Sequence, residues 1–576
     1  MTGAGLRSWL EDRRSNSRHE SGVVAVIVAF LAVVLLSIAA FTVDVGSRYV
    51  EGHREQRAAD AAALAGVVYL PGNPAKATAT ALKYAAANGY DDADPTIVVS
   101  VKVDKTPTRL RVSITHKINN SFAGLIGFPT ATISRSSVAD WAEPVPLGSP
   151  CNEFGNDPDS PNTSGVKSTR CAGADQFWAN IGSPAAAKGN GDAFQNGTCS
   201  GEDSCSGTTN ADYDANGYFY TVNVEQATTN LRIDVFDPAL ISVGDLCDSS
   251  QSDNSSIQNA AKLKPSTDKN PEAVVPDPAT RYAAGPDSPY CTGDISYNAK
   301  NQRDINQVST SYTIRNPPAN PWDPLSGTVR TDCTGAKTYP GYAGDLSKAL
   351  NQKHADYKVV TPGFGQGYVA QVFRRWVPLC TIASAPAGTY TIQVHTNGVG
   401  QDYAAGHNRF ALRAYSTTDS TAKDKVSVSG FNKMAIYANL PNATTSFFLT
   451  KVPAGARGQT LNVRLFDIGD STGNGTVKVV PPPDSGLTKF TGCKGFGVTG
   501  GTAGTNLTDC AITANSTYNG KWQTVSVPIP TNYTCSSSVP TGCWVRLQYA
   551  YGSGNQPSDT TSWTAGIEGD PVRLVE

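Results

Sequence analysis

The sequence has few charged side chains for its length. Asp, Glu, Lys and Arg make up 17% of its 576 residues, below the usual quarter or so. The net charge is −2 at pH 7, so there is no basic field to attract nucleic acid, and we predict no nucleic-acid partner. The low charge, together with 54 Gly, 36 Pro, 23 Tyr and 18 Phe, favours loop-rich β structure. A chain of this length is also expected to form more than one domain.

Cysteine is absent before Cys151, and no two cysteines have the CxxC spacing typical of zinc sites. All twelve cysteines lie between Cys151 and Cys543. An even number beyond an apolar N-terminal segment indicates disulfides in an oxidising compartment. Two local pairs are candidates, Cys493 with Cys510 and Cys535 with Cys543. The rest of the connectivity stays open.

Motifs of common enzyme classes are also missing. The chain has no GxxxxGK[ST] loop for phosphate and no HExxH pair for zinc. Residues 469–473 (GDSTG) match the G-x-S-x-G pattern of serine hydrolases, which requires a helix after the serine. Here a predicted strand follows, and no histidine occurs after His407. We therefore predict that the protein is not an enzyme and has no cofactor.

The same turn offers oxygen atoms that suit calcium. Asp467, Asp470 and Asn474 lie close together in the sequence, and such groups bind Ca²⁺ on sandwich loops. They do not follow the ligand pattern of an EF-hand. Asp and Asn are also common in turns because their side chains bond nearby backbone groups. A structural turn is the favoured interpretation, and a calcium site is the alternative.

One long apolar run stands out against this background. Residues 22–43 carry no charge, which is enough helix to cross a hydrocarbon core of about 30 Å. We predict a cytoplasmic tail at 1–20 and a transmembrane helix at 21–43. Since all cysteines follow the run, the N-terminus is expected inside and the bulk of the chain outside the cell membrane. The alternative is a signal peptide cleaved near Ala40, although the run is longer than a usual signal core.

The helix is predicted to continue beyond the membrane to residue 70. Residues 44–70 are rich in Ala, Arg, Glu and Gln, and Pro71-Gly72 ends the helix. Small side chains let another helix approach closely. The alternative is a solvated helix with no partner. The candidate helix-packing residues for assembly are Asp44, Gly46, Ala59, Asp60, Ala62 and Ala63.

This N-terminal segment resembles the Flp pilus-assembly TadE/TadG-like proteins of bacteria. The matching pieces are Gly22, Asp44-Val45-Gly46 and residues 56–66 (QRAADAAALAG). Members processed by a prepilin peptidase usually place a Glu five residues after the cleaved glycine, where this chain has Ile27. The resemblance therefore implies an uncleaved TadG-type anchor of the actinobacterial kind. It also implies partners among pilus-assembly proteins or pilins.

The next segment, 71–143, is predicted to be a small α+β domain. Pro74 begins a helix that ends near Asn88. Alternating apolar residues predict strands at 99–103 and 110–114, joined by a loop at 104–108. A short helix at 121–126 and a third strand at 131–141 complete the domain.

The remainder is predicted to form two tandem β-sandwich domains, 144–418 and 422–576. The first carries a long loop insertion at about 248–320. An internal duplication supports the pair, because two strands ending in Phe-Asp (231–237 and 461–467) recur with matching elements after each. The fold class is therefore α+β to mainly β. Two copies of one sandwich favour a spacer or binding module over an active site.

Together these features predict a membrane-anchored extracytoplasmic protein that assists assembly, anchoring or surface display of a Flp/Tad-type pilus. The alternative is a surface adhesin that binds carbohydrate or cell-wall polysaccharide. Exposed aromatic side chains such as Trp178 or Tyr403 would stack on sugars in that case.

Overall fold

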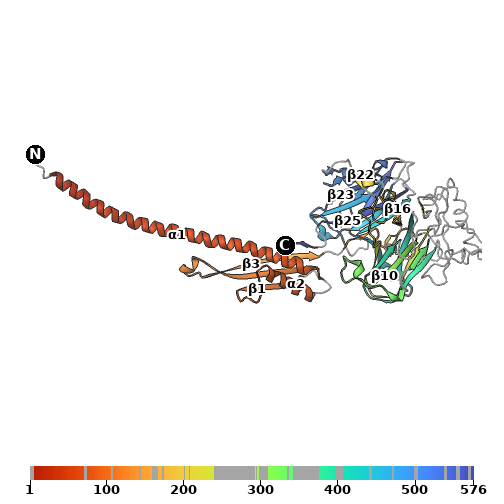
Figure 1. Cartoon of the computed structure of the whole chain (residues 1–576), viewed down its shortest axis with the longest axis horizontal. Helices are drawn as coiled ribbons and strands as arrows, with labels where there is room; N and C mark the ends of the chain where they lie inside the picture. Colours follow the sequence, from red (N-terminus) through yellow and green to blue (C-terminus); the bar gives the residue numbers. More distant parts are fainter. Residues whose placement is uncertain are drawn as a thin grey trace, which may run out of the picture. The chain divides into compact units, whose positions relative to one another are not determined.

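The computed structural model describes residues 5–70, 74–104, 108–141, 144–157, 166–171, 174, 176–199, 201–205, 208–238, 292, 295–296, 309–333, 337–340, 375–396, 406–439, 444–469, 473–497, 504–536, 541–552, 558–568 and 572–575. The chain divides into two compact units (Figure 1). Unit 1 comprises Met1–Ala142 and Gly569–Glu576, and unit 2 comprises Glu143–Glu568. Unit 2 is therefore inserted, in sequence, into unit 1.

The described residues of unit 1 form two α-helices and one four-stranded antiparallel sheet. Its helices are α1 (Gly5–Val67) and α2 (Pro74–Ala87). The sheet order is β1 (Ile97–Val103), β2 (Arg109–Asn119), β3 (Thr130–Trp141) and β26 (Val572–Leu574). A short 3₁₀ helix, η1 (Ala123–Ile126), lies between β2 and β3. The predicted helix from Pro74 and the three predicted strands are confirmed.

Small and branched residues form the core of unit 1. Ala77, Ala81 and Ala85 recur every four residues on α2, so they share one helix face, and all three are fully buried. On β2, Leu110, Val112 and Ile114 alternate with less buried residues and are also fully buried. The alternation places one face of the sheet against the helices.

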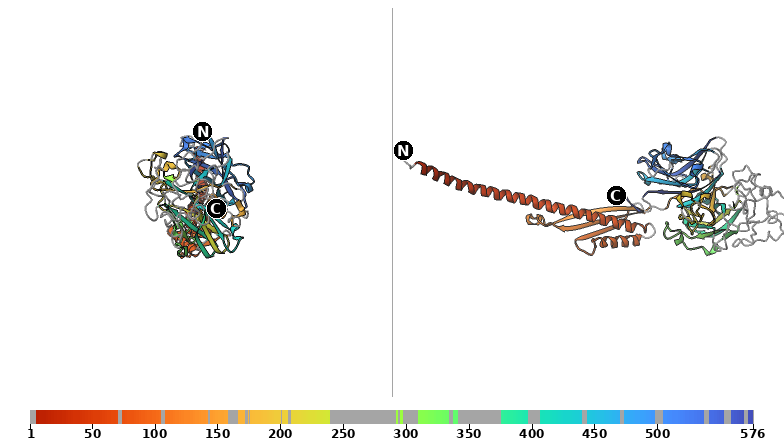
Figure 2. Two further views of the ribbon diagram at one scale, coloured as in Figure 1. Left: turned by 90° about the vertical axis from the view of Figure 1, so that its right-hand side faces the viewer. Right: turned by 45° about the horizontal axis from the view of Figure 1, so that its top comes forward.

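The fourth strand of this sheet comes from the far end of the sequence. Arg573 pairs with Asp140 of β3, and Val575 donates its backbone N–H to the carbonyl of Val138. The right-hand view of Figure 2 shows the C-terminal end of the chain at this sheet. The predicted second sandwich, 422–576, therefore extends too far, because residues 572–574 belong to the sheet of unit 1.

Unit 2 is an antiparallel β structure, in keeping with the predicted sandwiches. Its strands are β4 (Pro146–Leu147), β5 (Glu153–Phe154), β6 (Trp178–Gly182), β7 (Tyr218–Val224), β8 (Thr228–Phe236), β9 (Ile295–Ser296), β10 (Ser309–Arg315), β11 (Lys337–Pro340), β12 (Trp376–Ala385), β13 (Gly388–His395), β14 (Gly406–Ser416), β15 (Val426–Phe431), β16 (Lys433–Asn439), β17 (Thr444–Lys451), β18 (Thr460–Phe466), β19 (Gly475–Val480), β20 (Lys494–Phe496), β21 (Thr505–Asn506), β22 (Ala511–Ala514), β23 (Trp522–Pro528), β24 (Trp544–Tyr551) and β25 (Ser558–Ile567). Strand β10 lies inside the segment predicted as a loop insertion and pairs with β13, so that prediction is wrong for its last part. Residues 248–291 lie outside the described residues.

The pairing of the strands repeats the predicted duplication. In the first half β8 pairs with β12 and β14, while β7 pairs with β13. In the second half β18 pairs with β23 and β25, while β17 pairs with β24. Phe236 lies opposite Trp376 in the first copy, and Phe466 lies opposite Trp522 in the second. The two halves therefore share one topology as well as a sequence pattern.

The two halves are not separate at the predicted boundary. Strand β15, assigned from sequence to the second half, pairs with β7 of the first. Strand β6 of the first half pairs with both β14 and β16. Residues 143–568 consequently form one compact unit with a continuous apolar core.

Five disulfides join cysteines among the described residues of unit 2. They are Cys151–Cys171, Cys199–Cys205, Cys333–Cys380, Cys493–Cys510 and Cys535–Cys543. The last two are the local pairs that the spacing favoured. Cys333 and Cys510 each end a Thr-Asp-Cys 3₁₀ turn, a repeated element that the sequence comparison of the halves missed.

Candidate functional site

The first part of α1 has the properties of a membrane span. Within the described residues it is the one helix long and apolar enough, with a mean hydropathy of 3.1 in its most apolar window. None of that window is buried by the rest of the chain. Phe30 and Leu36, for example, are 70% and 69% exposed. Such a surface requires a nonpolar solvent, and this architecture fits a single-pass membrane protein.

Asp44 marks the end of the span and binds a distant loop. Its carboxylate is 3% exposed and accepts hydrogen bonds from the backbone amides of Ser121, Phe122 and Ala123, at 2.6–3.3 Å. Burial would raise the pKa of this carboxyl, but the three amide bonds outweigh it, so the pKa lies below its ordinary value. Asp44 therefore packs against this chain's own β2–β3 loop.

The predicted alanine contacts form within the chain. Ala59, Ala62 and Ala63 are fully buried, where α1 packs against α2 and the sheet. The expectation that they face a partner protein is therefore wrong, because α2 and the sheet of this chain cover this part of α1. Asp60 is half-buried and accepts a hydrogen bond from Gln56 at 2.9 Å. Gly46 is exposed, and a Cβ there would meet nothing within 4 Å.

Two glutamates on α1 also contact other elements of unit 1. Glu51 accepts hydrogen bonds from Tyr90 at 2.9 Å and contacts His116 Nδ1 at 3.2 Å. Glu55 is fully buried, and burial raises its pKa to about 7, against the lowering influence of Arg135. These contacts connect α1 to the loop after α2 and to β2. They fix α2 and the sheet of unit 1 to α1 and do not form an open cleft.

The calcium candidates lie at a tight turn after β18. Asp467 is buried, has a positive φ of 62° and accepts a hydrogen bond from the backbone amide of Gly520. Asn474 is exposed and accepts from the side-chain amide of Asn515 at 3.1 Å. Asp470 lies outside the described residues, as does the serine of the hydrolase-like motif. Asp467 therefore has a structural role, and calcium binding stays a prediction.

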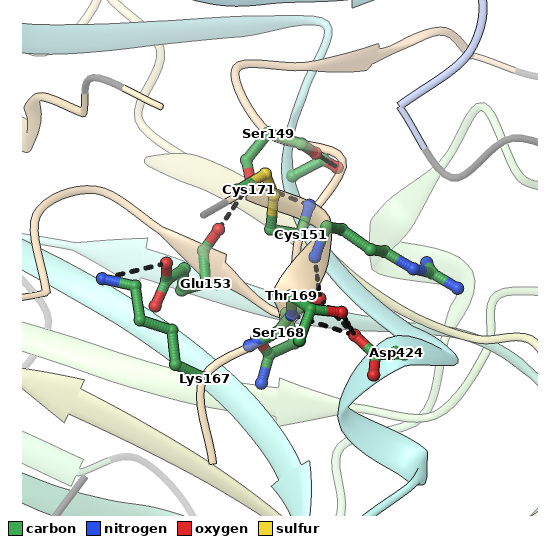
Figure 3. The surroundings of a disulfide bond; sticks show 11 residues. Ser149, Cys151, Glu153, Lys167, Ser168, Thr169, Cys171 and Asp424 are labelled. Carbon is green, nitrogen blue, oxygen red and sulfur yellow. Dashed lines mark hydrogen bonds and ion pairs between the residues drawn. A yellow bond between two sulfur atoms is a disulfide. The ribbon is translucent and has the colours of Figure 1, made fainter. Parts of the chain in front are cut away.

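Glu153 lies beside the Cys151–Cys171 disulfide (Figure 3) and forms a buried acidic pair with Asp157. Glu153, on β5, is 1% exposed and lies 3.6 Å from the ammonium of Lys167. Burial, together with the nearby carboxylate of Asp157, raises the pKa of Glu153 to about 8. The Cys151–Cys171 bridge closes the segment that carries Lys167, and Asp424 accepts hydrogen bonds from the hydroxyl of Ser168 at 2.8 Å. The sequence did not indicate this cluster, although all of its members except Asp424 lie between residues 151 and 171.

The Trp and Tyr side chains of unit 2 whose exposure the structure describes are buried or half-buried. Trp178 is fully buried and stacks on Phe236, with ring centroids 5.9 Å apart. The exposed large apolar side chains in this part are Leu325, Val329 and Phe496, none of them Trp or Tyr. The suggested role of Trp178 is therefore wrong, and Tyr403 lies outside the described residues.

Comparison with known proteins agrees with the span and its extension. Residues 22–79 match the family model described as putative Flp pilus-assembly TadE/G-like. The match covers the apolar span, the rest of α1 and the first turns of α2. It confirms the resemblance and sets this segment in the context of Flp pilus assembly. No curated protein and no solved structure matches the chain.

Proposed function

We propose that the protein is a non-enzymatic, single-span envelope protein that assists assembly, anchoring or display of a Flp/Tad-type pilus. The observation that carries the proposal is the TadE/G-like match over 22–79, on a helix with a lipid-compatible surface. Its N-terminus lies in the cytoplasm and unit 2 lies outside. The five disulfides support this orientation, because they persist in oxidising compartments.

The contact with pilus components falls on the face of α1 that the chain leaves uncovered above the span. Val45, Tyr49 and Val50 are 45%, 68% and 51% exposed there. Val45 and Tyr49 are four residues apart and lie on one side of the helix, beside the open Gly46. The alanines of α1 are buried within unit 1, so a partner helix would use this other face.

The test is co-purification from the native host with two matched variants. Tyr49→Arg places a charge on the proposed contact face, whereas Tyr84→Arg makes the same change on α2, where Tyr84 is 46% exposed. We expect pilins or assembly proteins to co-purify with the Tyr84 variant and not with the Tyr49 variant. Equal recovery with both variants would rule out this face, and recovery of no pilus component with the natural protein would refute the proposed function.

A further inference from the structure

The loop between β2 and β3 exposes large apolar side chains. Phe122, Leu125 and Phe128 are 43%, 85% and 65% exposed. No charged residue occurs between Lys117 and Arg135 in the sequence. Water-facing hairpin loops are usually polar, and contiguous apolar surface on a folded protein marks an interaction site. We name residues 120–129 the apolar loop.

The apolar loop lies beside the membrane span. Phe122 and Leu125 line a groove of about 520 Å³ together with Val33, Leu36 and Phe41 of α1. A helix rises ~1.5 Å per residue, so the groove runs along about 15 Å of the span below Asp44, which is half of a ~30 Å hydrocarbon core. The loop therefore occupies the same depth as span residues that lipid must cover.

Polar contacts fasten the loop at the point where the span ends. The carboxylate of Asp44 accepts hydrogen bonds from the backbone amides of residues 121–123, as described above. One turn further along α1, the Arg48 guanidinium donates to Asn120 Oδ1 at 2.8 and 3.2 Å. Asn120 in turn donates its side-chain amide to the carbonyl of Phe128 at 2.8 Å. Two successive turns of α1 thus fix the position of the loop.

Most backbone amides of the loop have a hydrogen-bond acceptor within the chain. Within hydrocarbon, each backbone polar group without a partner costs several kcal/mol, so bonded amides lower the cost of inserting a loop. Leu125 donates to Phe122 O, Gly127 to Gly124 O and Phe128 to Ala123 O, at 3.0–3.4 Å. The amides of residues 121–123 donate to Asp44, and Pro129 has no N–H.

We propose that the apolar loop inserts into the bilayer leaflet nearer to unit 1, with lipid acyl chains filling the groove between Leu125 and the span. The occupant is lipid because the groove continues the apolar surface of the span, which nothing else in the described chain covers. The protein then enters the membrane at two places, a spanning helix and a loop. Unit 1 is held against the bilayer instead of turning freely at the end of one helix.

The test uses the full-length protein in phosphatidylcholine/phosphatidylglycerol vesicles that contain a phosphatidylcholine with a photoreactive diazirine on its acyl chain. Trypsin cuts after Lys117 and Arg135, so the loop is recovered as the single peptide 118–135. The peptide 19–48 carries the span and serves as the internal positive control. We expect lipid adducts on both peptides. Adducts on 19–48 alone overturn the proposal.

Matched variants separate insertion from chance contact. Leu125→Asp places a charge at the loop tip, whereas Val98→Asp makes the same kind of change at a 58% exposed site on β1. We expect Leu125→Asp to lower the adduct yield on 118–135 by about tenfold, because a carboxylate is strongly disfavoured in hydrocarbon. Val98→Asp should leave the yield unchanged. An unchanged yield with Leu125→Asp overturns the proposal. No pilus component is present, so the result is independent of the proposed function.

Discussion

Three glycines of α1 differ sharply in their surroundings, which makes them a test of how this helix is packed. At Gly66 a Cβ would lie 2.5 Å from Leu110 Cδ2, 2.7 Å from the carbonyl oxygen of Ala77 and 3.0 Å from Ala81 Cβ. The backbone oxygen cannot move without shifting α2. At Gly46 nothing lies within 4 Å. Gly52 is intermediate, because its close neighbour is the flexible end of Arg135, 2.8 Å away.

The expected effects of alanine follow from these distances. Overpacking a tight core typically costs ~1–3 kcal/mol, so Gly66→Ala should destabilise unit 1 by about 1–2 kcal/mol after the small gain in helix propensity at a helix end. Gly46→Ala adds a methyl group to open space and should stabilise the helix by up to ~1 kcal/mol. Gly52→Ala should lie close to zero, because Arg135 can swing away.

Hydrogen exchange measures this locally in the full-length protein. We expect the amides of α2 and β2 to exchange about five- to thirtyfold faster in Gly66→Ala, the factor that corresponds to 1–2 kcal/mol of opening free energy. Exchange in Gly46→Ala should be unchanged or slower. If the amides of α2 exchange at the same rate in Gly66→Ala and Gly46→Ala, the close contact between α1 and α2 at Gly66 is refuted.

Three further predictions concern other parts of the chain. Glu153 has a pKa raised to about 8, so the folded chain keeps a proton that the unfolded chain loses near pH 4.3, and stability falls as the pH rises from about 5 to 8. In Glu153→Gln, denaturant unfolding should lose less stability between pH 5 and 8 than in the natural protein, and an equal loss would exclude Glu153 as the cause. Removal of residues 569–576 should destabilise unit 1 by ~2–4 kcal/mol, about 1 for each lost backbone hydrogen bond, and speed exchange in β3; unaltered exchange would contradict the strand pairing. Replacing Cys493 and Cys510 by serine should lower the unfolding free energy of unit 2 by about 3 kcal/mol, as expected for a loop of this length; a native denaturation midpoint would contradict a stabilising bridge.

Local patterns predicted the elements of unit 1 well and their partners poorly. The alternation of Leu110, Val112 and Ile114 identifies a strand because burial on one face of a sheet has a period of two residues. The alanines at 59, 62 and 63 indicate close packing around this part of α1. Their small size does not identify which element packs there. The partner of Asp44 lies 77 residues away in sequence, and no local rule connects them.

The duplication in unit 2 was visible because each copy keeps a long strand that ends in Phe-Asp. The pairing of strands between the copies was not, since β6 is only five residues long and its pairing depends on how the copies pack. The strand β26 was missed for a related reason. Three residues are too few to show a period, and their place in the sheet of unit 1 is set by the whole intervening chain.

The insertion of unit 2 between β3 and β26 also sets an order of events during biosynthesis. A ribosome completes α1, α2 and three strands of unit 1 long before it reaches the codons for residues 572–574. Until then the outer edge of β3 presents unpaired backbone groups, which are prone to join strands of other chains. A nascent chain that stalls within unit 2 keeps that edge open. The sheet of unit 1 therefore gains its fourth strand only after the ribosome has read through all of unit 2.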